Sequence, residues 1–177
     1  MENTGKIFDG YLVLEYRSGN SKALSLLVSR YHLQFCKHAY WYTRNMDSAK
    51  DIAQDSWSTI ITKISELRDP NKFKSWALRI VTRNSLDHLK RARKNKEAEA
   101  SNSLPSPELE RDDPKNKLKK LYGAISGLPL EQQVVLRLFY LENLSLKEVG
   151  EVLQISTGTV KSRLYYAREK LKLILIK

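Results

Sequence analysis

The sequence predicts an all-α protein with two small helical domains joined by a flexible acidic linker, the C-terminal domain containing a helix-turn-helix. Apolar residues recur at steps of three and four, and no useful length of chain alternates with the period of two that a half-buried strand needs. Charge is also divided into blocks: residues 1–95 carry a net +8, residues 96–114 a net −4 and residues 115–177 a net +7. We therefore expect domains at 1–95 and 115–177, with a linker at 96–114.

The overall charge narrows the partners of the chain. Its 177 residues include 31 Lys and Arg against 20 Asp and Glu, a net charge of +11, which favours nucleic acid or an anionic membrane surface. No apolar run approaches the roughly 18 residues of a membrane helix, and the N-terminus lacks the profile of a secretion signal. Cys36 is the single cysteine and cannot form an internal disulfide. We expect a cytoplasmic protein with no membrane insertion.

The N-terminal block predicts three helices. The first begins near Ser21, where Leu27, Tyr31 and Phe35 fall on one helical stripe. The predicted inward side of the second helix, which follows Asp47, is Ala49, Ile52, Ala53, Trp57, Ile60, Ile61 and Ile64. A turn at residues 69–71 separates it from a third helix, over residues 73–94. The predicted inward residues of that third helix are Trp76, Ile80, Leu86 and Leu89.

The segment between the two blocks has the composition of a linker. Residues 96–114 hold three of the five prolines and almost no large apolar side chains, so this segment cannot bury enough surface to fold alone. Its negative charge would repel nucleic acid, whereas the flanking domains would attract it.

The C-terminal block has the clearest local pattern, a short helix followed by a tight turn and a second helix. Ser145 and Glu148 have the spacing of a capping box, and Ser156 or Thr157 can cap the next helix. Apolar residues of the second helix step by four and three: Val160, Leu164, Ala167, Leu171 and Ile174. Its opposite face is polar and basic and suits a DNA major groove. Such a face is often merely solvated, but its combination with the capped helix and turn favours DNA binding.

The C-terminal block closely resembles the promoter-reading C-terminal domain of bacterial sigma factors of the extracytoplasmic-function type, within the sigma-70 family. The residues that carry this resemblance are 128–129, 134–140, 144–164 (LSLKEVGEVLQISTGTVKSRL) and 167–168. Two helices of the N-terminal block also resemble that family. The resemblance to its polymerase-binding helix lies in Asp47, Ala49, residues 51–52, residues 54–55 and Trp57. The resemblance to its promoter-opening helix lies in Phe73, Trp76, residues 79–80, Asp87, Leu89 and Arg91. The resemblance implies a sigma region 2-like domain at 1–95 and a region 4-like domain at 115–177.

The resemblance also implies the site residues and partners. Those expected to bind the upstream promoter element are Ser156, Thr157, Thr159, Lys161, Ser162, Arg163, Tyr165 and Arg168. Those expected to bind the downstream element are Lys72, Arg79, Arg83, Asn84, Asp87, Lys90 and Arg91. Those expected to bind core polymerase are Asp51, Gln54, Asp55 and Trp57. The implied partners are the β and β′ subunits of core RNA polymerase and promoter DNA, both duplex and single-stranded. Whether an anti-sigma factor or another recruiting protein also binds stays open.

The chain departs from the family pattern at three positions. Gln154 stands where the family usually has a glycine in the turn, so either a non-glycine residue adopts a left-handed backbone there or the turn differs. Gly150 stands where alanine is preferred, which allows close helix contact but weakens the first helix. The asparagine that the family has in its promoter-opening helix aligns with Arg83 of this chain, and Asn84 follows one residue later.

Two other classes of function agree less well with the sequence. A helix-turn-helix regulator with an N-terminal sensor domain would share the C-terminal half, but it does not account for the pattern at residues 51–57 or for the basic third helix. An enzyme would need a catalytic set, which the three histidines do not form. His32 and Cys36 lie four apart on one helix, but two ligands do not close a zinc site. We therefore expect a sigma factor that needs no catalytic residue, metal or cofactor.

Overall fold

The computed structural model describes residues 2–98 and 114–175, which form helices and connecting turns with no β-strand among them. The predicted all-α class is confirmed. Contacts within the chain divide it into two compact units, residues 1–100 and 101–177. Residues 96–98 continue the last helix of the first unit, and Pro114 begins the first helix of the second. The rest of the predicted linker, residues 99–113, lies outside the described residues.

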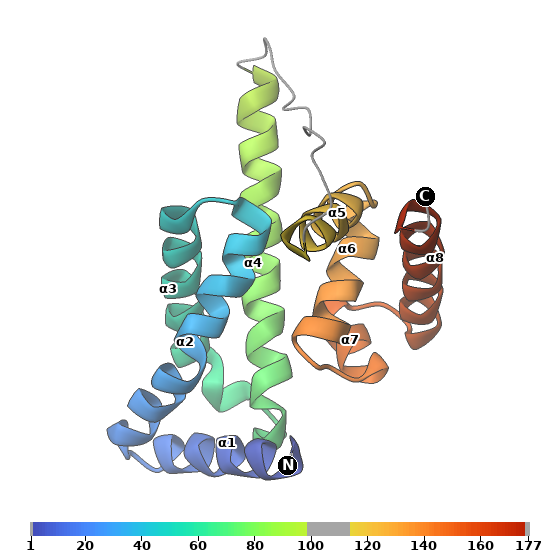
Figure 1. Ribbon diagram of the computed structural model, residues 1–177. Helices are drawn as coiled ribbons and strands as arrows, with labels where there is room; N and C mark the ends of the chain where they lie inside the picture. Colours follow the sequence, from blue (N-terminus) through green and yellow to red (C-terminus); the bar gives the residue numbers. More distant parts are fainter. Residues whose placement is uncertain (1, 99–113, 176–177) are drawn as a thin grey trace. The chain divides into compact units, whose positions relative to one another are not determined.

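The N-terminal unit is a helical bundle crossed at one end by its first helix (Figure 1). Its helices are α1 (Glu2–Arg17), α2 (Ser21–Thr43), α3 (Met46–Lys63) and α4 (Phe73–Ala98). Two short 3-10 turns, η1 (Ile64–Glu66) and η2 (Pro70–Lys72), connect α3 to α4. Helices α2, α3 and α4 pack against one another, and α1 crosses the end of this bundle against α2 and η2.

Helix α1 was missed in the sequence, so the expectation of three helices in this unit is wrong. Its apolar stripe is blurred because Ile7 and Tyr11 are exposed while Asp9 is buried. The Asp9 carboxylate accepts hydrogen bonds from the Tyr31 hydroxyl and, at 2.9 Å, from Arg30 Nε of α2. These long-range contacts, rather than local periodicity, fix α1 on the bundle.

Arg17 ties the end of α1 to the connection between α3 and α4. Its Nε donates to the Ile64 carbonyl at 3.1 Å, and its Nη2 donates to the Leu67 carbonyl at 2.6 Å. Further along α1, a Cβ atom at Gly10 would lie 2.3 Å from the side-chain oxygen of Asn71 in η2. The lack of a side chain at position 10 lets η2 lie close to α1, and the hydrogen bonds of Arg17 hold the Ile64–Leu67 end of the α3–α4 connection against α1.

Aromatic rings form the centre of the N-terminal core. The Phe35 ring of α2 lies 5.8 Å from that of Tyr31 and 5.2 Å from that of Trp57, centroid to centroid. Phe73, the first residue of α4, contacts both Tyr31 and Trp57. Such tilted and offset ring pairs add stabilisation beyond their buried area.

The predicted inward face of α4 needs correction. Its fully buried residues are mostly small or polar, namely Phe73, Ser75, Ala77, Leu78, Val81, Thr82 and Ser85. The predicted inward residues Trp76, Ile80, Leu86 and Leu89 are only half-buried. The difference arises because the buried hydroxyls are satisfied: Thr82 bonds His38 of α2 at 2.9 Å, and Ser85 donates to the Val81 carbonyl at 2.8 Å. On α3, Ile61 is exposed rather than buried.

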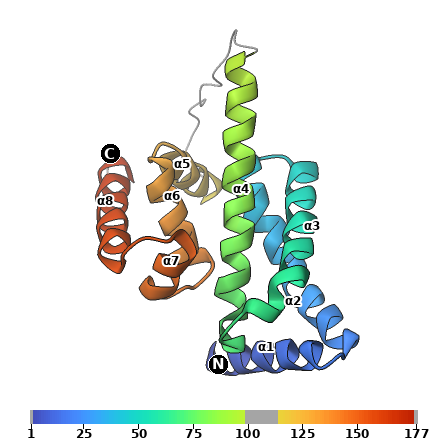
Figure 2. The same cartoon turned by 180° about the vertical axis from the view of Figure 1, so that it is seen from behind.

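The C-terminal unit is a smaller helical bundle (Figure 2). Its helices are α5 (Pro114–Ser126), α6 (Leu130–Leu136), α7 (Leu146–Leu153) and α8 (Thr157–Leu175). Helix α8 packs against the other three. Val160, Leu164 and Ala167 of α8 are buried as predicted, but Leu171 is half-buried and Ile174 exposed. The packed part of α8 is therefore shorter than its apolar stripe.

A π-helical turn, η3 (Arg137–Leu141), follows α6 and leads to the helix-turn-helix. The buried Arg137 guanidinium meets the buried Glu142 carboxylate, with Nη2 3.2 Å from Oε1. Asn143 then takes a left-handed backbone with φ 52°, which asparagine tolerates better than most residues. Leu144 N then donates to the Leu138 carbonyl at 3.1 Å, which holds the turn against η3 before α7 begins. No helix in the described parts of either unit has both the length and the apolar character to cross a membrane.

Replacing Tyr31 with phenylalanine tests the bond that holds α1. Loss of a donor to the buried Asp9 carboxylate should lower the free energy of unfolding by about 1–3 kcal/mol at pH 7. Burial, and then Asp9, raise the pKa of Tyr31 above its ordinary 10.0. The unfolded tyrosine thus ionises first, so stability from this hydroxyl is complete below pH 10 and is lost as the pH rises further. Urea unfolding measures the difference in the free energy of unfolding between the parent and Tyr31→Phe, and this difference should be smaller at pH 11 than at pH 7. An equal difference at both pH values would contradict the prediction.

Candidate nucleic-acid interface

The turn between α7 and α8 determines where the second helix of the helix-turn-helix starts. The predicted capping box is confirmed, since Glu148 N donates to Ser145 Oγ at 3.2 Å and Ser145 N to the Glu148 carboxylate at 2.8 Å. Gln154 ends α7 in a left-handed backbone with φ 56°. The chain thus keeps the left-handed turn that a glycine would favour, but builds it with glutamine.

Gly150 explains how the two helices of this motif approach each other. Ile155 N donates to the Gly150 carbonyl at 3.1 Å. A Cβ atom at position 150 would lie 2.8 Å from the Ile155 carbonyl oxygen, a backbone atom that cannot swing aside. The glycine is therefore required by the tight return of the backbone after α7.

Helix α8 presents the predicted upstream-element residues on its solvent side. Ser156 precedes the helix, and its Oγ accepts from Thr159 N at 3.1 Å. Opposite the buried Val160, Leu164 and Ala167, most of the predicted residues are exposed. The exposed members are Ser156, Thr157, Lys161, Ser162, Tyr165 and Arg168, with Thr159 and Arg163 half-buried. We call the set Thr157, Lys161, Ser162, Tyr165 and Arg168 the α8 strip.

Two contacts of this surface were not predicted. Arg163 Nη2 lies 2.5 Å from the Oε2 atom of Glu131 in the first turn of α6. The guanidinium of Arg168 lies over the ring of Tyr140, 5.8 Å from its centroid, and Tyr140 is itself exposed. Neither partner could be found from sequence, because α6 and η3 were not assigned there.

The predicted downstream-element residues of α4 fall on two faces rather than one. Arg79, Arg83 and Lys90 are exposed and follow the helical spacing of a single outward face. Asp87 lies beside them, with its Oδ2 3.9 Å from Arg83 Nε. Asn84 and Arg91 instead line a groove toward α3. Lys72, at the end of η2, is half-buried.

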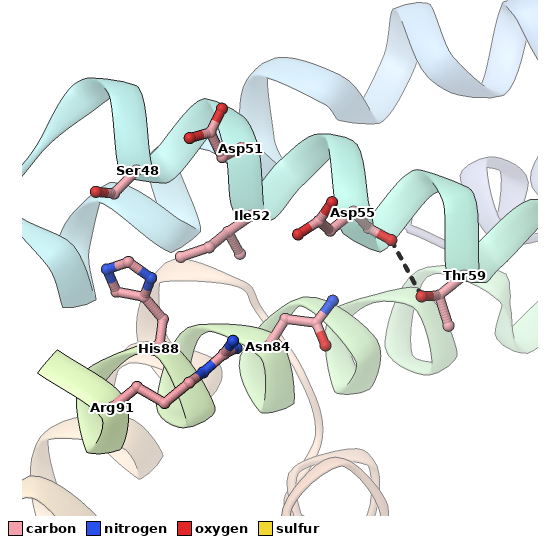
Figure 3. Close-up of a pocket in the computed structure, with 8 residues that line it drawn as sticks. All are labelled: Ser48, Asp51, Ile52, Asp55, Thr59, Asn84, His88 and Arg91. Carbon is pink, nitrogen blue, oxygen red and sulfur yellow. Dashed lines mark hydrogen bonds between the residues drawn. The ribbon is translucent and has the colours of Figure 1, made fainter. Parts of the chain in front are cut away.

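The groove between α3 and α4 has a volume of about 270 Å³ (Figure 3). Its lining residues are Ser48, Asp51, Ile52, Asp55 and Thr59 of α3 and Asn84, His88 and Arg91 of α4. Asn84 Nδ2 donates to Ser56 Oγ at 3.0 Å, which holds the two helices together at its base. Carboxylates line one side, whereas an amide, an imidazole and a guanidinium line the other. The predicted polymerase-binding acids and two predicted DNA-binding residues thus share one groove.

Of the predicted polymerase-binding residues, Asp51, Gln54 and Asp55 are exposed, but Trp57 is only 6% exposed. Trp57 packs against Phe35 and Phe73, which confirms its predicted place on the inward side of α3. Its physical role is to anchor α3 so that the polar residues face outward. His32 Nε2 lies 3.6 Å from Cys36 Sγ, and the described residues contain no cluster of three or more metal-binding side chains.

Both units match known sequence families. Residues 27–95 match Sigma-70 region 2, and residues 118–171 match Sigma-70, region 4. The chain is 30% identical over 158 residues to RNA polymerase sigma factor SigV of Bacillus subtilis, an alignment that covers 89% of this chain and 94% of that protein. It is 26% identical to the ECF RNA polymerase sigma factor SigW of the same organism, covering 90% of this chain and 92% of the relative.

Solved structures show the same fold. CnrH in complex with the cytosolic domain of CnrY aligns with a TM-score of 0.71 at 24% identity, over 95% of this chain and 97% of that one. The sigma factor RpoE of Bartonella quintana, in complex with the anti-sigma factor NepR, aligns with a TM-score of 0.68 at 19% identity, over 87% of this chain and 97% of that one.

Alanine at Gly150 tests the close approach in the helix-turn-helix. The added methyl group would force the turn away from α7, so Gly150→Ala should lower the melting temperature of the chain and its affinity for promoter DNA. Gly123→Ala is the matched control, because a Cβ atom there meets nothing within 4 Å and alanine favours the helix by about 1 kcal/mol. Thermal unfolding followed by circular dichroism compares the two. A Gly150→Ala chain as stable as Gly123→Ala would show that the turn tolerates a side chain.

Proposed function

The chain belongs to the extracytoplasmic-function group of the sigma-70 family, and on that premise we propose which of its surfaces meet polymerase and promoter. Its function is sequence-specific promoter recognition and transcription initiation as a sigma factor bound to core RNA polymerase. The observation that carries the proposal is the α8 strip, a polar and basic surface opposite the buried Val160, Leu164 and Ala167. We propose the same domain division as above, with region 2 functions in 1–95, a linker at 96–114 and region 4 functions in 115–177.

We propose that α8 enters the major groove of the upstream promoter element. The duplex groove, about 12 Å wide, admits a helix, and residues near the helix N-terminus reach base edges. Lys161 and Arg168 would contact phosphates and set the register. Arg163, or Lys161 in place of its phosphate contact, would read a guanine edge, a contact that discriminates by about 1–3 kcal/mol. Ser156, Thr157, Thr159, Ser162 and Tyr165 complete this proposed surface.

We propose that α4 meets the downstream element with its outward face. Arg79, Arg83 and Lys90 share that face, which suits them to follow the phosphates of a separated strand. Lys72 and Asp87 border it. Asn84 and Arg91 lie in the groove instead, so their proposed contribution is at the α3 side of the strand.

Asp51, Gln54 and Asp55 are proposed to contact core polymerase, with Trp57 supporting them from the core. Since Asp51 and Asp55 share a groove with Asn84 and Arg91, the proposed polymerase and strand-binding surfaces adjoin each other. Binding of polymerase at one side of the groove would then orient the other side for DNA. This would let polymerase binding and promoter opening support each other.

The proposed mechanism is differential binding, with no bond made or broken by this chain. One unit favours duplex DNA, the other favours separated strands, and polymerase holds both in register. The protein is proposed to act in the cytoplasm with the β and β′ subunits of the polymerase. The solved complex of RpoE with the anti-sigma factor NepR supports an anti-sigma factor as a further proposed partner.

Run-off transcription tests the function directly. Purified core polymerase is given a genomic DNA library with and without the chain. Initiation at a restricted set of promoters is expected only when the chain is present, and Arg163→Ala should lose recognition of the upstream element. A helix-turn-helix regulator would instead bind DNA without polymerase and leave the start sites of core enzyme unchanged. Equal initiation by core enzyme alone would contradict the proposal.

A double substitution tests the polymerase surface. Asp51→Asn with Asp55→Asn removes both carboxylates from the α3 side of the groove with little change in shape. Affinity for core polymerase, measured by fluorescence anisotropy of the labelled chain, should fall by about tenfold, in line with the loss of two charge-assisted contacts. Glu66→Gln, an exposed change on η1, serves as the control and should bind normally. If the double variant and the control bound core polymerase with equal affinity, the Asp51 and Asp55 carboxylates would not be part of the interface.

A further inference from the structure

Two adjacent tyrosines of α8, Tyr165 and Tyr166, expose their rings side by side. Each residue is 60% exposed, and the two ring centroids lie 5.5 Å apart at an interplanar angle of 75°. Tyr165 belongs to the α8 strip, whereas Tyr166 was not among the predicted upstream-element residues. Successive residues of a helix point about 100° apart, so a contact between these two rings means that the Tyr166 side chain leans toward the strip. We call the two rings the tyrosine pair.

The tyrosine pair lies on the face of α8 that points away from the core. Ser162 is exposed one turn before Tyr166 on this face, and the exposed Gly158 lies a further turn back. Ser162 Oγ donates to the Gly158 carbonyl at 2.8 Å, so the short side chain folds back onto its own helix. The two tyrosines are therefore larger than the groups that precede them on this face. From Thr157 to Tyr166 the helix rises by about 14 Å, close to the major groove's width of about 12 Å.

The chemistry of the tyrosine pair favours an apolar group of DNA over a phosphate. The rings carry no positive charge, and Glu169, which is exposed one turn further along the same face, would repel a phosphate beside them. In the major groove, the apolar group that a base presents is the 5-methyl group of thymine. Contact between this methyl group and an exposed ring removes apolar area of both from water and is therefore favourable.

We infer that Tyr166, together with Tyr165, reads the 5-methyl group of a thymine in the upstream promoter element. Tyr166 is then a further specificity-determining residue of α8, beyond the residues of the α8 strip. This inference rests on the proposed entry of α8 into the major groove.

The test measures how the full chain, in complex with core polymerase, binds duplexes in which single thymines are replaced by deoxyuridine, which lacks the methyl group. The duplexes carry a promoter that run-off transcription identifies, and each thymine of the upstream element is replaced in turn on either strand. For the parent chain, one such replacement should weaken binding about fourfold, the effect of one methyl group lost from an apolar contact. Tyr166→Ala should bind the thymine and deoxyuridine duplexes equally well at that position. Tyr166→Phe keeps the ring and should keep the fourfold difference.

Tyr122→Ala is the matched control, because Tyr122 is a tyrosine of α5 with a similar exposure of 55%. It should keep the fourfold difference, and its melting temperature provides the comparison for folding of Tyr166→Ala.

The outcomes separate the inference from the proposed function. If Tyr166→Ala keeps the difference, or if no replacement weakens binding of the parent, the inference is overturned and the proposed function stands. Loss of the difference in Tyr166→Phe would assign the contact to the phenol hydroxyl and would also overturn the inference. If the parent complex binds equally well whatever the sequence of the upstream element, the proposed entry of α8 fails, and the inference fails with it.

Discussion

The rotation of α8 about its own axis is the constraint on which the account of this protein depends. Burial of Val160, Leu164 and Ala167 fixes that rotation, and the α8 strip is exposed as a consequence. The start of the helix is fixed separately, by the left-handed Gln154 and the close approach at Gly150. If the packing of α8 shifted by one residue, the helix would rotate by about 100° about its axis and part of the α8 strip would become buried. Apolar packing and backbone geometry thus determine which polar residues can meet DNA.

Polar contacts play the corresponding part in the N-terminal unit. The bonds of Asn84 with Ser56 and of Thr82 with His38 join α4 to α3 and α2. Because a buried polar group without a partner is costly, these bonds favour one alignment of the helices over its neighbours. That alignment places Asp51 and Asp55 across a groove from His88 and Arg91. The same seam therefore determines both the outward basic face of α4 and the proposed surface for polymerase.

The sequence predicted the features that depend on the residues of a single helix, and it failed for features that depend on contacts between helices. The capping box of α7 and the first three residues of the buried stripe of α8, Val160, Leu164 and Ala167, are local features, and they were predicted. Helix α1 depends on Asp9, Arg17 and their partners more than 20 residues away, so its periodicity alone did not reveal it. The buried face of α4 was misjudged because its hydroxyls find hydrogen-bond partners. Trp57 was placed both on the inward side of its helix and among the polymerase-binding residues, and its burial confirms the first placement.

The most direct measurement of the central claim is site-specific photo-crosslinking in the complex with core polymerase on promoter DNA. A photo-reactive residue is placed at Ser162 in the α8 strip, at Arg83 on the outward face of α4, or at Tyr122, exposed on α5. The account predicts crosslinks from position 162 to the upstream duplex, from position 83 to the downstream element, and none above background from position 122. Crosslinks to both elements from positions 162 and 83 alike, or stronger crosslinks from position 122, would contradict it.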